Sequence, residues 1–150
     1  QAAGSAGMAG GQAIDLASVG QRLTENQLRE MHRLKTGALL QGSVMMGAAC
    51  GAATPAQTRG LEAYGAALGL AFQVVDDILD VTADSATLGK TAGKDAEQDK
   101  PTYVSLLGLE RSQAFAHTLL VQALQALDSC ALVQPHALRA LAEMVVNRRA

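Results

Sequence analysis

Hydrophobic side chains recur at helical spacing along most of the chain. After a Gly-rich opening, a first apolar group is formed by Ile14, Leu16 and Val19. Gly20 follows directly and is expected to end this helix. Thr24, with Gln27 three residues later, is a capping-box pattern and predicts the start of another helix. The chain is therefore expected to open with two helices joined by a short turn.

The helix that begins near Thr24 changes character along its length. Its first part is amphipathic, with Leu28, Met31 and Leu34 expected to face inward and Arg29, Glu30 and Arg33 outward. After Lys35 and Thr36, residues 37–49 carry no charge at all. We therefore expect this second half to be enclosed on every side by other parts of the protein.

A second long helix is predicted from about Pro55 to Val81. Gly65 and Gly69 lie four residues apart within it, a spacing that lets a neighbouring helix approach closely. In a membrane the same spacing would indicate helix dimerisation. No apolar run here has the length needed to cross a bilayer, so a close contact inside a soluble helical bundle is the better interpretation.

One long loop, residues 84–100, separates these helices from the rest of the chain. Pro101 suits the first turn of a following helix. Two further helices are indicated by the apolar series Phe115, Leu119, Ala123, Leu127 and Leu138, Leu141, Val145. The sequence shows no β-type alternation. The predicted fold class is therefore all-α, a helical bundle with long central helices.

Composition narrows the possible functions. The 150 residues suffice for a sizeable core, and a net charge of −2 with 3 % aromatic residues disfavours binding to nucleic acid. Residues 1–11 lack the basic start and hydrophobic centre of a signal peptide. Cys50 and Cys130 lie among small apolar residues, which favours reduced core thiols of a cytoplasmic protein over a disulfide. Because the chain starts at Gln1 within a Gly/Ala-rich run, we expect a piece of something longer.

The candidate chemistry is concentrated in residues 72–80. Three carboxylates arrive within five residues at the end of a segment that is otherwise almost free of ionisable groups. On a helix, one polar stripe would be formed by Gln73, Asp76, Asp77 and Asp80. The cluster contains no His or Cys, so oxygen-only ligation of Mg²⁺, Mn²⁺ or Ca²⁺ is favoured over zinc. Because the acids lie on a helix, an EF-hand is excluded.

Lysines are the expected partners of this acid cluster. Mg²⁺ usually completes its coordination with water and substrate phosphates, which suggests a phosphorylated substrate. Three lysines follow the acids, namely Lys90, Lys94 and Lys100, and Lys35 precedes the uncharged half of the earlier helix beside Thr36. The alternative is that Asp80 merely ends a helix and that these lysines solvate a loop.

Four motifs together resemble one enzyme family. Asp76-Asp77-Ile78-Leu79-Asp80, preceded by Phe72-Gln73 and followed by Leu88-Gly89-Lys90 and Asp99-Lys100, resembles the second aspartate-rich region of the trans-polyprenyl diphosphate synthases. Lys35-Thr36 resembles their Lys-Thr motif, and Gly11-Gln12-Ala13-Ile14-Asp15 their Gly-Gln-x-x-Asp motif. The resemblance covers essentially the whole chain. Within the family, residues 69–73 and 87–90 are most similar to bacterial farnesyl diphosphate synthases.

The resemblance implies a head-to-tail condensation of isopentenyl diphosphate with an allylic diphosphate, which is dimethylallyl or geranyl diphosphate. It implies Mg²⁺, with Mn²⁺ as a substitute, held by Asp76 and Asp80 with Asp77 in support. Lys35, Lys90 and Lys100 would bind the allylic diphosphate. Thr36 and Gln73 would present oxygens to the developing carbocation. Gln12 and Asp15 would line or support the site.

The resemblance also implies that the chain is incomplete as a catalyst. The family's first aspartate-rich motif has no counterpart before Gln12, so residues 1–150 are expected to be the C-terminal part of one helical domain of the isoprenoid-synthase type. The N-terminal half would be a partner, and a homodimer is implied as well. The other hypotheses are a non-catalytic prenyl-synthase-like subunit and a class I terpene cyclase.

Overall fold

A computed structural model of the protein describes residues 1–82 and 100–148. Its helices are α1 (Met8–Ala17), α2 (Glu25–His32), the π-helix η1 (Arg33–Gly37), α3 (Ala38–Cys50), α4 (Pro55–Thr82), α7 (Tyr103–Leu107), α8 (Leu109–Ser129) and α9 (His136–Asn147). The described ranges contain no strand. The all-α prediction is confirmed. Within these ranges no helix is both long and apolar enough to cross a membrane.

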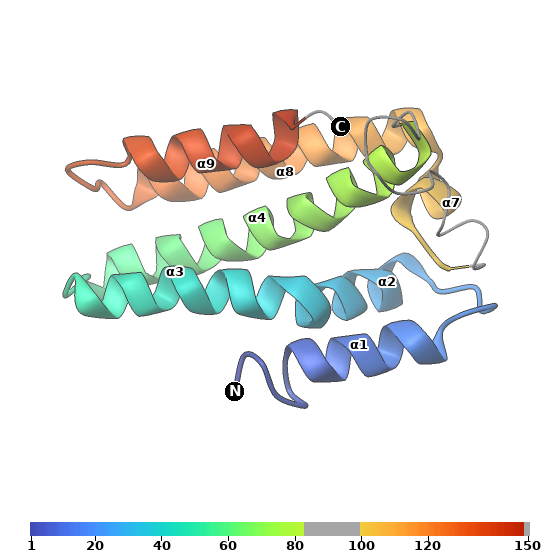
Figure 1. Ribbon diagram of the computed structural model, residues 1–150. Helices are drawn as coiled ribbons and strands as arrows, with labels where there is room; N and C mark the ends of the chain where they lie inside the picture. Colours follow the sequence, from blue (N-terminus) through green and yellow to red (C-terminus); the bar gives the residue numbers. More distant parts are fainter. Residues whose placement is uncertain (83–99, 149–150) are drawn as a thin grey trace.

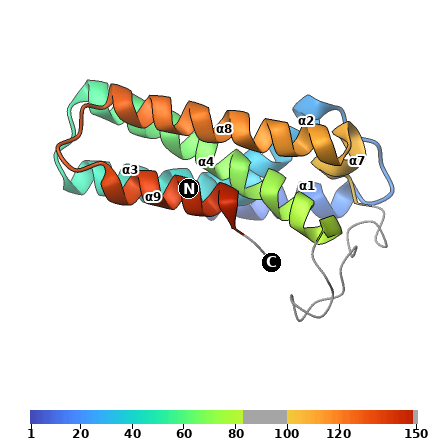
Figure 2. The same ribbon diagram turned by 90° about the horizontal axis from the view of Figure 1, so that it is seen from above.

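Helix α4 is the central element of the bundle. Figure 1 shows it between the rod formed by α2, η1 and α3 on one side and the α8–α9 hairpin on the other. Seen from above, α8 and α9 run side by side along it, and α7 lies beside its C-terminal end (Figure 2). Buried side chains occur along its whole length, from Leu61 and Tyr64 to Val75 and Ile78. The Tyr64 hydroxyl donates a hydrogen bond to the Leu138 carbonyl oxygen at 2.7 Å, which joins α4 to α9.

The predicted start of α2 is confirmed by its N-terminal cap. The Thr24 side chain accepts a hydrogen bond from the backbone N–H of Gln27 at 3.4 Å, and the Gln27 side chain accepts one from the backbone N–H of Thr24 at 2.9 Å. These bonds satisfy two donors that a helix N-terminus leaves unpaired. Before them, Gly20 adopts a φ of 73°, which turns the chain after α1 as expected.

Glycines allow η1 to lie unusually close to two other helices. A methyl group on Gly69 of α4 would come within 2.8 Å of the Gly37 Cα atom. On the α1 side of η1, a methyl group on Gly11 would come within 2.8 Å of the Leu34 carbonyl carbon. The predicted close approach of a helix at Gly65 and Gly69 is therefore confirmed, and its partner is the η1–α3 rod.

Three expectations are wrong in the described chain. Helix α3 is not enclosed, since only Ala48 of it is buried and Leu39 and Met46 are 40 % and 65 % exposed. Cys50 is exposed, although it is a free thiol as predicted. Both differences arise because α4 is the main neighbour of α3 and covers one face of it.

The third wrong expectation concerns Pro101, which lies before the next helix and not in its first turn. This helix starts at Tyr103, and Thr102 is its cap, because the Thr102 side chain accepts a hydrogen bond from the Ser105 N–H at 3.0 Å.

Candidate active site

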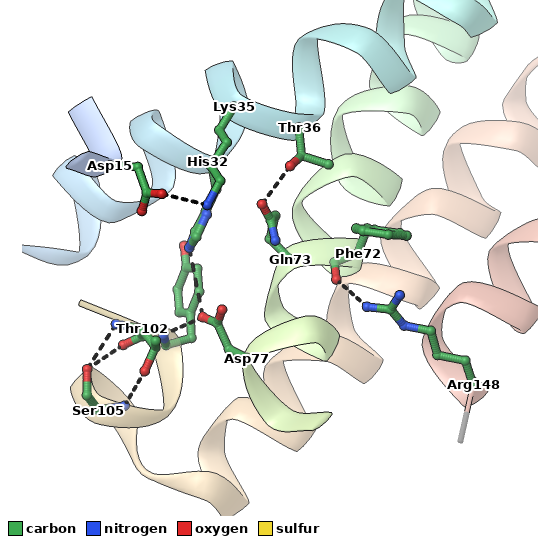
Figure 3. A network of polar contacts seen from close by, with 11 residues as sticks. Asp15, His32, Lys35, Thr36, Phe72, Gln73, Asp77, Thr102, Ser105 and Arg148 are labelled. Atoms are coloured by element: carbon green, nitrogen blue, oxygen red, sulfur yellow. Dashed lines mark hydrogen bonds and ion pairs between the residues drawn. The ribbon is translucent and has the colours of Figure 1, made fainter. Parts of the chain in front are cut away.

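The π-helix η1 carries the Lys-Thr motif at the middle of the long helical rod. A π turn adds a residue to the helical repeat and is frequent at functional sites. Lys35 and Thr36 both lie within this segment, with α2 before it and α3 after it. Figure 3 shows that the Lys35 side chain reaches the side of Asp15, whereas Thr36 points toward Gln73 on α4. The side chains of Lys35 and Thr36 therefore contact different helices, α1 and α4.

Lys35 is bound by the carboxylate of Asp15 on α1. Its Nζ atom lies 2.8 Å from Asp15 Oδ2, and the two side chains are 31 % and 13 % exposed. Asp15 is thus nearly buried, whereas the Lys35 side chain is partly exposed. The structure brings Lys35 and Asp15 together as parts of one site. Gln12, on the same helix as Asp15, is exposed.

Thr36 and Gln73 form a direct link between η1 and α4. The Thr36 hydroxyl donates to the Gln73 side-chain oxygen at 2.6 Å. Gln73 is only 5 % exposed, so the bond is sheltered from water. Two oxygen dipoles are therefore held in place beside the lysine. Such fixed dipoles stabilise a developing positive charge better than mobile water does.

The acid cluster is divided between two environments, so the predicted single stripe is only partly present. The Asp76 side chain is 59 % exposed and lies 3.3 Å from Nη2 of Arg148. Asp80, one turn further along α4, is half-buried. Asp77 is buried and accepts a hydrogen bond from the Tyr103 backbone N–H at 2.7 Å. Asp76 and Asp80 share one row of the helix, because residues four apart lie above one another.

The predicted metal ligands do not form a closed cluster by themselves. Within residues 1–82 and 100–148, the structure has no group of three His, Cys, Asp or Glu side chains at metal-binding distances. The oxygen chemistry of Asp76 and Asp80 nevertheless suits a hard cation. Lys100 is half-buried and lines a hollow of about 500 Å³ together with Arg22 and Leu28. Lys90 and Lys94 lie outside the described residues.

Arg148 is a site residue that the sequence analysis did not find. Its guanidinium group donates to the Phe72 carbonyl oxygen at 3.0 Å and lies 4.2 Å from the centre of the Phe72 ring. Figure 3 shows Arg148 reaching Phe72. The same group contacts Asp76, so the end of α9 reaches the start of the acid cluster. Only the basic character of Arg148-Arg149 after the last apolar position hinted at this role.

His32, the last residue of α2, was also missed. Its ring is 3 % exposed, stacks on Tyr103 with 5.7 Å between ring centres, and has Nε2 3.8 Å from Asp77 Oδ2. Burial, with a smaller contribution from Lys35, lowers the pKa of His32 to about 4, against the opposing effects of Asp15 and Gln73. The signal was available, because His32 is four residues after Leu28 and so continues the buried face.

We expect the stability of the protein to fall on mild acidification because of His32. Above pH 6.5 the ring is neutral in both states; between pH 6.5 and 4 the unfolded chain takes up a proton that the folded chain does not. The free energy of unfolding should therefore drop by about 2 kcal/mol from pH 7 to pH 5. Urea denaturation at pH 7 and at pH 5 measures this difference in the free energy of unfolding.

The variant His32→Gln should show a smaller change of the free energy of unfolding with pH, whereas His117→Gln, at an exposed position, should behave like the wild type. An equal change with pH in all three proteins would contradict the assignment to His32.

These elements define an all-α protein with an oxygen- and lysine-bearing site between η1 and the C-terminal half of α4. The sequence profile of the polyprenyl synthetase family matches residues 2–141, and the chain therefore belongs to this family. It is 50 % identical over 131 residues to a probable farnesyl diphosphate synthase of Sinorhizobium fredii, covering 85 % of this chain and 40 % of that protein. It is 49 % identical over 117 residues to a chloroplastic geranylgeranyl pyrophosphate synthase of Catharanthus roseus, covering 77 % of this chain and 33 % of that protein.

A solved structure has the same arrangement of helices. A geranyltransferase from Helicobacter pylori, complexed with magnesium and isoprenyl diphosphate, superposes with a TM-score of 0.77 and 38 % identity over 94 % of this chain and 46 % of that chain. The chain thus spans less than half of each of these three proteins.

Proposed function

We propose that the protein to which this chain contributes is a Mg²⁺-dependent prenyltransferase that condenses isopentenyl diphosphate with an allylic diphosphate. The observation that carries the proposal is the hydrogen bond between Thr36, next to Lys35 on η1, and Gln73 on α4, the helix that also carries Asp76 and Asp80. One cation, two fixed oxygen dipoles and two hard-cation ligands are what the ionisation of a diphosphate ester requires. The family and the ligands of the Helicobacter pylori structure support it.

Each group has a definite task in this reaction. Asp76 and Asp80 would hold Mg²⁺, which would supply positive charge to the leaving diphosphate. Lys35, kept in position by Asp15, and Lys100 bind diphosphate oxygens, and Lys90 is proposed for the same role. The allylic C1–O bond breaks, the isopentenyl double bond attacks C1, and a proton passes to the released pyrophosphate. Thr36 and Gln73 present oxygen dipoles to the allylic cation while it lasts.

The surroundings of the site suit an isoprenoid chain. An apolar hollow of about 580 Å³ lies between α3, α4 and α9, and Val44, Leu61 and Leu141 contribute to its walls. Val44 follows Thr36 by about two helical turns along the same rod of helices. Apolar walls keep water from a carbocation. The N-terminal half of the enzyme and a second copy are the partners that we propose.

Farnesyl diphosphate is the product that we propose, and an assay of the full-length protein tests this. With dimethylallyl diphosphate, isopentenyl diphosphate and Mg²⁺, we expect pyrophosphate release and a C15 product, and a chelator should abolish both. A C20 product would instead match the relatives named geranylgeranyl synthases. Consumption of farnesyl diphosphate without isopentenyl diphosphate would indicate a terpene cyclase, and no turnover of either kind would indicate a non-catalytic subunit.

A further inference from the structure

We propose that Asp77 is a positioning residue that keeps the helices carrying the site residues in place, and that it is not itself a metal ligand. The contacts concerned form the Asp77 node, which we define as Asp77, His32 and Tyr103. The node lies behind the site and joins α4, α2 and α7 (Figure 3). The inference rests on the proposed function only where it concerns Mg²⁺ and substrate.

The first contact of the node secures the start of α7. Asp77 Oδ2 accepts the Tyr103 backbone N–H at 2.7 Å, and both residues are buried. This N–H belongs to the first turn of a helix and has no partner within it. A hydrogen bond from a buried N–H to a carboxylate is about twice as strong as a neutral one. Lys100 lies three residues before Tyr103, so its backbone position is tied to α4 through this bond.

The second contact of the node is made by the last residue of α2, at its junction with η1. His32 Nε2 lies 3.8 Å from the same Asp77 oxygen, and the ring stacks on that of Tyr103. His32 is directly followed by η1, which carries Lys35 and Thr36. Asp77 thus holds the start of α7 by a hydrogen bond, and the His32 ring, stacked on Tyr103, places the junction before Lys35 and Thr36 against the same residues.

The two neighbouring aspartates differ in a way that a shared metal-binding role does not explain. The Asp77 side chain is 6 % exposed, whereas that of Asp76 is 59 % exposed. Consecutive residues of a helix point about 100° apart, whereas Asp76 and Asp80 lie in one row. Asp77 faces α7 and α2, and we assign ligation to Asp76 and Asp80 only.

Three variants of the full-length protein test this division of roles. Asp77→Asn keeps an oxygen that can accept the Tyr103 N–H, so the Mg²⁺ concentration for half-maximal activity should stay within about twofold of the wild-type value. Asp77→Ala loses the bond and should raise the KM for the allylic diphosphate about tenfold. Asp76→Asn should instead raise the Mg²⁺ requirement about tenfold or more. If Asp77→Asn raised the Mg²⁺ concentration for half-maximal activity as much as Asp76→Asn does, the proposal would be overturned.

Hydrogen–deuterium exchange tests the anchor without substrate or metal. Amide exchange around Tyr103 should be about tenfold faster in Asp77→Ala, less accelerated in Asp77→Asn, which keeps a neutral acceptor, and unchanged in Asp76→Asn. Unchanged protection in Asp77→Ala would refute the anchoring role even if the enzyme is active. If Asp77→Ala does not fold, the comparison of Asp77→Asn with Asp76→Asn decides alone. Because exchange needs no turnover, an inactive wild-type protein would count against the proposed function and not against the anchor.

Discussion

Replacing Asp76 by alanine is expected to lower the kcat of the full-length protein about 10²- to 10³-fold while the fold is preserved. The substitution removes one of the two carboxylates proposed to hold Mg²⁺, which neutralises the leaving diphosphate. Its structural cost is small, because the Asp76 side chain is 59 % exposed and its contact with Arg148 is 3.3 Å long. Exposed ion pairs contribute about 0–1 kcal/mol.

Asp128→Ala is a matched control for this substitution. Asp128 also lies on a helix, pairs with an arginine, Arg139, and has a side chain that is 61 % exposed, but it is remote from the Lys-Thr motif in the fold. Pyrophosphate release should be measured at saturating substrates over a range of Mg²⁺ concentrations. Asp128→Ala should keep the wild-type rate. An Asp76→Ala rate equal to that of wild type would remove Asp76 from the metal site.

Gly11→Ala is expected to destabilise the protein by about 3 kcal/mol and to impair the site at the same time. The added methyl group would overlap the backbone nitrogen of Lys35 and lie 2.8 Å from the Leu34 carbonyl carbon. Backbone atoms cannot rotate away as a side chain can, so α1 must move off η1. This movement would pull Asp15 away from Lys35, whose atoms are now 2.8 Å apart.

Gly47→Ala separates this effect from a general effect of alanine in a helix. Gly47 lies inside α3, and a methyl group there would meet no atom within 4 Å. Alanine stabilises a helix interior relative to glycine by about 1 kcal/mol, so this variant should be neutral or slightly more stable. Urea denaturation gives the free energies, and the KM for the allylic diphosphate reports on Lys35. Wild-type stability in Gly11→Ala would show that α1 is not held as closely as the structure indicates.

The helices themselves followed from local patterns in the sequence. The capping box at Thr24 placed the start of α2 correctly, and the predicted helix from Pro55 to Val81 differs from α4 by one residue at its end. These features depend on hydrogen bonds and apolar spacing within a few residues, which a sequence displays directly. The motifs that resemble the polyprenyl synthetase family were equally visible, because each is a short run of consecutive residues.

The roles of individual site residues did not follow from local patterns. The sequence could not show that Arg148 meets Asp76 or that Tyr103 binds Asp77, because these partners are 72 and 26 residues apart. The π turn at η1 was also invisible, because α1 and α4 pack against it through Gly11 and Gly69, far away in the chain.

The sequence by itself thus determined the all-α class, the start of α2, the extent of α4 and the chemical types of the site, since apolar period, caps and carboxylate clusters are local properties. Only the tertiary structure decided which aspartate is exposed and which is buried. On the helix, Asp76 and Asp77 are adjacent and chemically identical. They differ because α7 and α2 pack against one side of α4 and leave Asp76 in contact with solvent and Arg148.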